Sequence, residues 1–208
     1  MHNNPLSSND HVAGNYYDKY HTKNPLARWL MRGFLSAFDE LIALTDARDV
    51  FEVGCGEGEL SLRMLRRGLT VRGVDLGASV VAHARVTAEA EGFSPAFEVS
   101  DLYTLTPETA SAELVVCCEV LEHVPEPERA LRILAELGQP WLLLSVPHEP
   151  IWRMLNMARG KYLSHWGNTP GHTQRWSVKG FKQFVQAHVQ IVETRTPLPW
   201  TLLLCRCD

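Results

Sequence analysis

The residues best suited to chemistry lie in a glycine-rich segment, which reads Glu-Val-Gly-Cys-Gly-Glu-Gly over residues 52–58. It stands where an apolar stretch gives way to a helical pattern, and glycines at such a turn let a ligand approach the backbone closely. The spacing is Gly-x-Gly-x-Gly, not the Gly-x-Gly-x-x-Gly of a pyrophosphate site. Acids at Glu52, Glu57 and Glu59 repel a pyrophosphate, but they suit a ligand that carries an amine and a sulfonium.

Two further acids follow the next two predicted strands. Asp75 is placed to accept hydrogen bonds from both hydroxyls of a ribose. Asp101 precedes Leu102, so that the carboxylate can accept an adenine amino proton while the leucine packs on the ring. Either acid alone could be a solvated loop residue. Together with the glycine-rich segment, they predict a nucleoside site at successive strand ends.

The elements that must position these residues alternate between helix and strand. Helical patterns cover 25–42, 60–67, 78–91, 127–137 and 178–188. Strand patterns cover 50–53, 70–74, 96–99, 114–118, 141–146, 189–195 and 201–205. This alternation predicts an α/β fold with a mostly parallel sheet covered on both faces. The last two strands have no helix between them, so we expect an antiparallel hairpin.

The length of 208 residues predicts one domain. We divide it into an N-terminal arm and cap helix (1–44), a cofactor-binding half (45–147), an insertion or lid (148–176), and a C-terminal helix and hairpin (177–208). The insertion is too long for an ordinary strand–helix connection and is rich in aromatic and basic residues. Its alternative role is a structural flap over the sheet edge.

Composition excludes several classes of protein. Hydrophobic residues make up 45% and charged residues 21%, which is typical of a soluble globular protein. The net charge of −4 provides no global attraction for duplex nucleic acid. No apolar stretch approaches the roughly 20 residues of a membrane span. The five cysteines form no CxxC pair and the N-terminus is polar, so we expect a cytoplasmic protein.

A second group of chemical residues follows the fourth predicted strand. If helical turns continue there, Glu119, Glu122 and His123 share a face and form a partial shell for Mg²⁺ or Mn²⁺. His172 offers a further imidazole before the last helix. Without a metal, His123 or His172 would be the candidate general base, and His148 a weaker one.

The sequence resembles the class I S-adenosylmethionine-dependent methyltransferases. The matching residues are 50–58, Val71-Arg-Gly-Val-Asp75, Val99-Ser-Asp101, 114–124 and 142–147, and the resemblance covers about residues 45 to 205. It implies a Rossmann-like, seven-stranded sheet of order 3-2-1-4-5-7-6 with strand 7 antiparallel. It also implies that Glu52, Gly54 and Gly56 hold the methionine end of the cofactor, Asp75 the ribose and Asp101 the adenine. The remaining members of the predicted cofactor site are Cys55, Leu76, Leu102 and Glu119.

Within that family, the motif Glu-x-x-Glu-His at 119–123 is similar to one in ubiquinone-pathway O-methyltransferases. A later histidine before a tryptophan is similar to small-RNA 3′-terminal 2′-O-methyltransferases. Carried over, Glu119, Glu122, His123 and His172 would hold a divalent ion, and Glu119, His123 and His172 would be catalytic. The same motif also occurs in members of the superfamily where we expect no metal.

The predicted acceptor is a small molecule with a hydroxyl group. The residues expected to line its site are Tyr16, Tyr20, His148, Trp152, Trp166 and Arg175. The alternatives are methylation of an RNA 3′-terminal ribose, a non-catalytic subunit that binds S-adenosylmethionine, and a nicotinamide oxidoreductase. Glu52 and the glycine spacing disfavour the last of these. The sequence leaves the acceptor's identity and the oligomeric state open.

Overall fold

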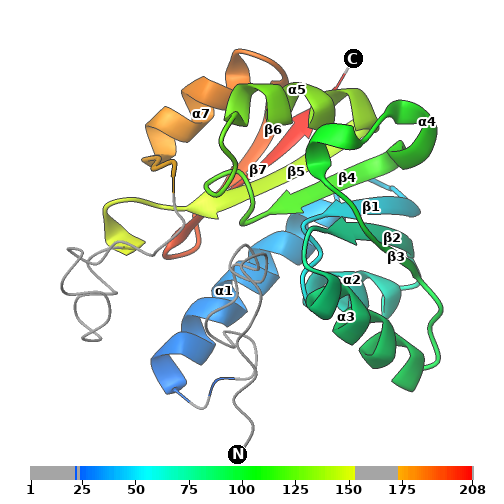
Figure 1. Cartoon of the computed structure of the whole chain (residues 1–208). Coiled ribbons are helices and arrows are strands. Elements are labelled where there is room, and N and C mark those ends of the chain that lie inside the picture. Colours follow the sequence, from blue (N-terminus) through cyan, green and yellow to red (C-terminus); the bar gives the residue numbers. More distant parts are fainter. Residues whose placement is uncertain (1–21, 23, 153–172, 208) are drawn as a thin grey trace, which may run out of the picture.

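A computed structural model describes residues 22, 24–152 and 173–207, which form a seven-stranded sheet with helices on both faces (Figure 1). The strands are β1 (Asp49–Val53), β2 (Thr70–Asp75), β3 (Ala96–Val99), β4 (Ala112–Cys118), β5 (Gly138–Pro147), β6 (Gln190–Arg195) and β7 (Trp200–Arg206). The helices are α1 (Pro25–Ile42), α2 (Glu59–Leu65), α3 (Ala78–Ala90), α4 (Pro107–Ala110), α5 (Pro127–Leu137) and α7 (Val178–Gln186), with a short 3₁₀ turn, η2 (Leu102–Thr104).

The sheet has the order β3-β2-β1-β4-β5-β7-β6. The first five strands run parallel, and β7 pairs antiparallel with both β5 and β6. The predicted topology and the C-terminal hairpin are therefore confirmed.

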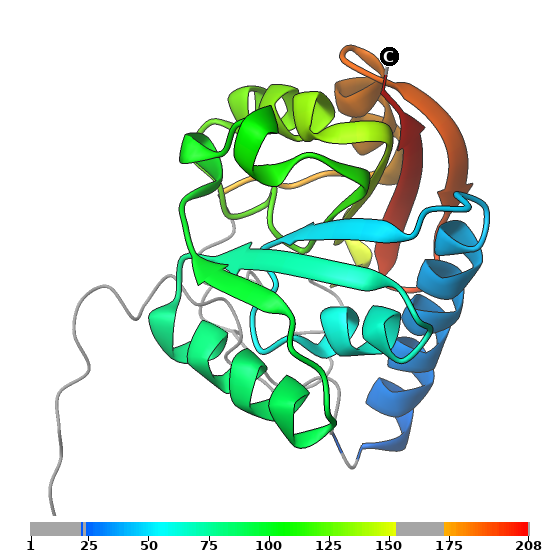
Figure 2. The same cartoon turned by 90° about the vertical axis from the view of Figure 1, so that its right-hand side faces the viewer.

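Each face of the sheet has its own set of helices (Figures 1 and 2). The helices α1, α2 and α3 cover one face, and α4, α5 and α7 cover the other. The central strand β4 is buried on both faces, from Leu114 to Cys118. An uninterrupted apolar strand is typical of the middle of a parallel sheet.

Helix α1 is defined at its start by two local signals. Pro25 stands in its first turn, and the side chain of Asn24 accepts the N–H groups of Leu26 (2.9 Å) and Ala27 (3.2 Å). These bonds satisfy donors that have no partner inside a helix. The apolar stripe then packs α1 against the sheet and buries Phe34 and Phe38.

The boundaries differ from the predicted ones in a few places. Strand β5 begins at Gly138, whereas we had predicted its start at Trp141. Helix α4 and the turn η2 were not predicted, because four and three residues are too few to show a helical period. Among the described residues, none of the helices combines the length and apolar character needed to cross a bilayer.

The packing of the hydrophobic core can be tested at Leu143. This residue is fully buried in β5, beside Val116 of β4 and Leu204 of β7. Leu143→Ala leaves a cavity in the central sheet and should lower the free energy of unfolding by about 2–5 kcal/mol. Chemical denaturation measures this loss. The control Val192→Ala, at a residue of β6 that is 44% exposed, should change stability by about 0.5 kcal/mol or less. Equal losses in the two variants would contradict this account of the core.

Candidate functional site

Many of the predicted cofactor-binding and catalytic residues lie at the carboxyl ends of the parallel strands, along one edge of the sheet. The N–H of Gly56, in the loop after β1, donates to Oδ2 of Asp75 at the end of β2 (2.9 Å). The N–H of Ser100, after β3, donates to the carbonyl of Asp75 (3.0 Å). The loops after β1, β2 and β3 are therefore joined by hydrogen bonds, at the edge where ligands bind in open α/β sheets.

The glycine-rich loop has a backbone that other residues adopt only with strain. Gly54, Gly56 and Gly58 have φ angles of 79°, 53° and 84°. A Cβ on Gly54 would collide with the side chain of Val120, which follows β4, whereas a Cβ on Gly56 would meet nothing within 4 Å. Gly54 is thus required by a close approach inside the protein. Gly56 borders open space, where a ligand can reach the backbone.

Asp75 has a carboxylate that the backbone holds in place. Besides the bond from Gly56 to Oδ2, the N–H of Gly77 donates to Oδ1 (2.8 Å). Two ionised oxygens offer about four acceptor positions, so these bonds orient the group without using all of them. Leu76 beside it is 54% exposed. An oriented carboxylate next to an exposed apolar side chain fits the predicted ribose and a neighbouring ring.

The side chains of Asp101 and Leu102 point in different directions, one to the surface and one into the core. Asp101 is exposed, and its Oδ1 accepts the N–H of Tyr103 (2.9 Å), which caps the turn η2. The carboxylate lies at the edge, as predicted for an adenine contact. Leu102 is only 6% exposed and packs into the core beneath α5. The capped turn directs this side chain inward, and its contact with an adenine ring stays a prediction.

Glu52 lies beneath the glycine-rich loop. The carboxylate is 3% exposed and accepts a hydrogen bond from the hydroxyl of Ser61 in α2. Burial raises the pKa of Glu52 from 4.5 to about 8; the Ser61 bond opposes this shift and the charge of Asp75 adds to it. Glu52 therefore acts on the site through the loop above it, since its side chain has little surface.

Cys55 presents only its backbone to the site. Its side chain is 5% exposed and packs with Val81 and Phe97 between the sheet and α3. Burial raises the pKa of this thiol well above its usual range. The N–H groups of Gly54 and Cys55 both donate to the carbonyl of Val74 (2.8 and 3.0 Å), which fixes the first turn of the loop.

Glu119 ends β4 in an unusual conformation, with a φ of 60°. Its Oε2 accepts the indole N–H of Trp200 at the start of β7 (2.8 Å). Its Oε1 accepts the hydroxyl of Ser145 in β5 (3.3 Å), and its own N–H donates to the carbonyl of Ser145 (3.0 Å). Glu119 thus connects the ends of three strands on the side of the edge opposite to Asp75.

The residues after Glu119 form a tight turn. The N–H of His123 donates to the carbonyl of Val120 (2.9 Å), and Glu122 is 2% exposed. The carbonyl of Glu122 accepts the N–H groups of Thr173 (2.8 Å) and Gln174 (3.1 Å), so the chain that enters α7 is held against this turn. The helical continuation that we considered for 119–123 is therefore absent.

The structure does not bring the predicted metal ligands together in the part of the chain it describes. Within residues 22, 24–152 and 173–207, no three histidine, cysteine, aspartate or glutamate side chains form a cluster that could hold a metal ion. This range includes Glu119, Glu122 and His123. His172 lies outside the described residues, and the metal stays a prediction.

Three of the six residues predicted to contact the acceptor are described. The N–H of His148 donates to the carbonyl of Pro199 (2.7 Å), which places His148 beside the start of β7. The ring of Trp152 packs on Trp200, with centroids 5.9 Å apart, and Arg175 is exposed. The predicted residues outside the described part of the chain are Tyr16, Tyr20 and Trp166.

Sequence reasoning missed three residues of this edge. These are Val120, which lies against Gly54, and the two hydrogen-bond donors to Glu119, namely Ser145 and Trp200. A signal for Ser145 existed, because it is the single polar residue in the apolar run 141–146. Trp200 had no such signal, since its role depends on the antiparallel pairing of β7 with β5.

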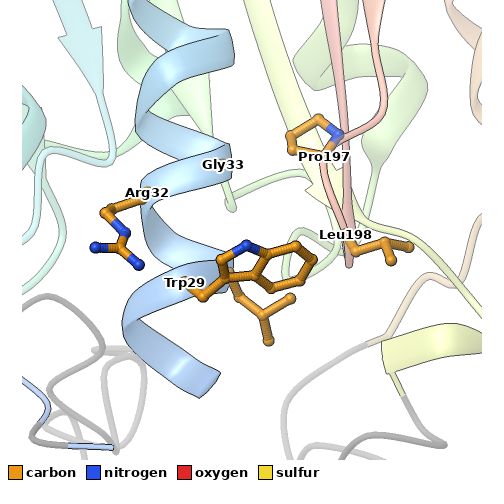
Figure 3. A pocket seen from close by; sticks show the side chains of 6 residues that line it. Trp29, Arg32, Gly33, Pro197 and Leu198 are labelled. Carbon is orange, nitrogen blue, oxygen red and sulfur yellow. The ribbon is translucent and has the colours of Figure 1, made fainter. Parts of the chain in front are cut away.

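A hollow of about 370 Å³ lies elsewhere, between the outer side of α1 and the turn before β7 (Figure 3). Its lining residues are Trp29, Leu30, Arg32, Gly33, Pro197 and Leu198. None of the predicted site residues belongs to it. We therefore assign the site from the hydrogen bonds at the sheet edge and not from the shape of this hollow.

The titration of Glu52 generates a test of this geometry. With its pKa raised to about 8, folded Glu52 keeps its proton between pH 4.5 and 8, while the unfolded chain loses it. The stability that this group contributes is present below pH 4.5 and is lost as the pH rises to 8. Thermal unfolding should therefore show that the melting temperature of Glu52→Gln, relative to the wild type, increases between pH 5 and pH 8.5.

Glu89→Gln, at an exposed position of α3, is the control and should show no such trend. A Glu52→Gln difference that is the same at both pH values would mean that Glu52 does not titrate in this range.

Comparisons with known proteins bear on the family and on the fold. Residues 50–140 match the family described as "Methyltransferase domain". A ubiquinone biosynthesis O-methyltransferase of Hahella chejuensis is 35% identical over 129 residues, which cover 62% of this chain and 51% of that protein. One from Coxiella burnetii is 34% identical over 93 residues, 45% of this chain and 40% of that protein. The chain thus spans about half the length of the curated relatives that it matches.

The fold has solved counterparts. The crystal structure of magnesium protoporphyrin IX methyltransferase (ChlM) from Synechocystis PCC 6803 with bound SAM superposes with a TM-score of 0.69. The superposition covers 99% of this chain and 100% of that one, at 19% sequence identity. At this identity the likeness concerns the fold alone. The family match over residues 50–140 and the strand order together support a class I S-adenosylmethionine-dependent methyltransferase domain that resembles the ubiquinone biosynthesis O-methyltransferases.

Proposed function

We propose that this protein transfers a methyl group from S-adenosylmethionine to a hydroxyl oxygen of a small molecule. The observation that carries the proposal is the hydrogen bond from Gly56 to Asp75, which joins the glycine-rich loop to a carboxylate at the adjacent strand end. The names of the sequence relatives, which are O-methyltransferases, support an oxygen acceptor.

The described residues fit the cofactor. Gly56 leaves open space above the loop, and the nearby carboxylate of Asp75 favours a cationic ligand. We assign the backbone of Gly54–Gly56 to the methionine end, Asp75 to the ribose, and Asp101 with the exposed Leu76 to the adenine. A nicotinamide dinucleotide fits less well, because its pyrophosphate would lie against these acids.

The reaction needs no covalent intermediate with the protein. The bound cofactor supplies an electrophilic methyl group on a sulfonium, and the acceptor oxygen displaces the sulfur in one step. The protein's part is to hold the acceptor hydroxyl in line and to receive its proton. Glu119 suits the second task, since its carboxylate is oriented by Trp200 and Ser145 at the same edge.

Two histidines are alternatives to Glu119 as the base. His123 is half-buried in the next turn, and His172 lies outside the described residues. The predicted divalent ion would also affect how the acceptor hydroxyl loses its proton, and no step above depends on it. A requirement for it would appear as activity that EDTA removes and added Mg²⁺ restores.

The two other predicted functions remain open to experiment. An RNA 3′-terminal ribose presents the same kind of hydroxyl, and its use would appear as methyl transfer to an RNA oligonucleotide. A non-catalytic subunit would bind S-adenosylmethionine without turnover. Neither alternative changes the assignment of the cofactor residues.

Cofactor binding is tested by calorimetry with S-adenosylmethionine and with NAD. S-adenosylmethionine should bind and NAD should not. Asp75→Ala removes a charged hydrogen-bond acceptor and should weaken the binding of S-adenosylmethionine about 10- to 150-fold. The control Glu89→Ala should bind like the wild type. Tight binding of NAD, or unchanged binding by Asp75→Ala, would contradict the assignment.

The role of Glu119 is tested with catechol as the acceptor probe and radiolabelled S-adenosylmethionine. Glu119→Gln keeps the shape of the side chain but cannot take a proton, so kcat should fall by about 10²-fold or more. The control is Glu128→Gln, at an exposed position of α5.

The accompanying measurement is the affinity of each variant for S-adenosylmethionine. If Glu119 acts as the base, this affinity should change little. A loss of affinity with unchanged kcat would instead assign Glu119 to the cofactor site.

A further inference from the structure

We propose that Trp200 is a positioning residue for methyl transfer, which acts by holding the carboxylate of Glu119 toward a proton-bearing acceptor. This inference rests on the proposed function. It adds a residue outside the segment that matches the methyltransferase family, and it narrows the class of acceptor.

The ring of Trp200 is fixed by its surroundings. It lies at the start of β7, opposite Pro147 of β5, and is only 4% exposed. Phe34 of α1 packs on it with a centroid distance of 5.1 Å, and Trp152 with 5.9 Å. A side chain packed on two sides loses its rotamer freedom, so the direction of its indole N–H is set before any ligand binds.

The contact with Glu119 has the geometry of a strong hydrogen bond. The distance of 2.8 Å between Nε1 and Oε2 is typical of an N–H donor to an ionised carboxylate. Indole nitrogen only donates, so this bond requires Glu119 to accept. The hydroxyl of Ser145 contacts the other oxygen, at 3.3 Å. With a donor on each oxygen, the plane of the carboxylate cannot rotate freely.

The backbone of Glu119 adds a third constraint. Its φ of 60° is rare for a residue with a side chain, and the hydrogen bond from its N–H to the carbonyl of Ser145 holds it there. Strained backbone of this kind is frequent at functional sites, where the surrounding structure maintains it.

The arrangement selects the chemistry of the acceptor. A carboxylate whose two oxygens face the donors of Trp200 and Ser145 acts as a hydrogen-bond acceptor. The partner of Glu119 must therefore carry a proton, as a phenol or alcohol does. An acceptor that offers only a carboxylate would be disfavoured. We therefore infer methyl ethers, and not methyl esters, as the products.

The contact itself can be tested without turnover, by ¹H–¹⁵N spectra of the indole groups in the full chain. Trp200→Phe keeps a ring between Phe34 and Trp152 and removes one indole resonance, which assigns Trp200. In Glu119→Gln that resonance should move upfield, because a charged acceptor has been replaced by a neutral one. If it does not move, the contact is absent and the proposal fails.

The catalytic consequence is tested with catechol and benzoate as probes. Trp200→Phe should lower kcat with catechol about tenfold, while KM for S-adenosylmethionine stays within about twofold. Ser145→Ala, which changes no ring, should lower kcat in the same sense. The matched control Trp141→Phe concerns a β5 residue whose ring faces Arg206, and it should leave kcat unchanged. The wild type should not methylate benzoate.

A double-mutant cycle separates positioning from a general structural effect. If Trp200 acts through Glu119, Trp200→Phe should have no further effect in the Glu119→Gln background. Losses that multiply in the double variant, unchanged kcat in Trp200→Phe, or methylation of benzoate would each overturn the inference while the wild type remains a methyltransferase. A wild type that methylates none of the probes would overturn the proposed function, and this inference with it.

Discussion

The site depends on one hydrogen bond, from the N–H of Gly56 to the carboxylate of Asp75. It joins the loop after β1 to the end of β2, and it can form only because the loop turns through left-handed backbone at three glycines. Asp75 also accepts the N–H of Gly77, so one carboxylate organises two loops. The backbone on which we place the methionine end and the ribose of the cofactor is therefore held by this carboxylate.

The same arrangement brings a second acid, Glu52, close to Asp75. Glu52 is buried under the loop, and its raised pKa of about 8 reflects mainly its burial, with a smaller contribution from the charge of Asp75. A cationic ligand above the loop would relieve this repulsion and favour ionised Glu52. The titration of one acid therefore depends on the other, and this coupling supports our proposal of a sulfonium nucleoside over a pyrophosphate.

The regular elements could be predicted from the sequence, and the residues beyond the strand ends only in part. The alternating patterns predicted a mostly parallel sheet with a buried strand at 114–118, and the family resemblance implied the strand order. The local conformations of Leu102 and Glu119 could not be predicted in this way. Leu102 turns inward because Asp101 caps a 3₁₀ turn, and Glu119 leaves the helical spacing through a φ of 60°. Neither conformation produces a hydrophobic period, so neither could be read from spacing.

The proposed cofactor residues and the residues that orient Glu119 come from different parts of the chain. The glycine-rich loop, Asp75, Asp101 and Glu119 all lie within residues 50–140, which match the methyltransferase family. The groups that orient Glu119 lie outside that segment, in β5 and β7, and α1 supports them through the contact of Phe34 with Trp200. In the proposed function, the segment that matches the family holds the cofactor and flanking elements orient the acceptor. On that proposal, the choice of acceptor depends on residues that the family match does not include.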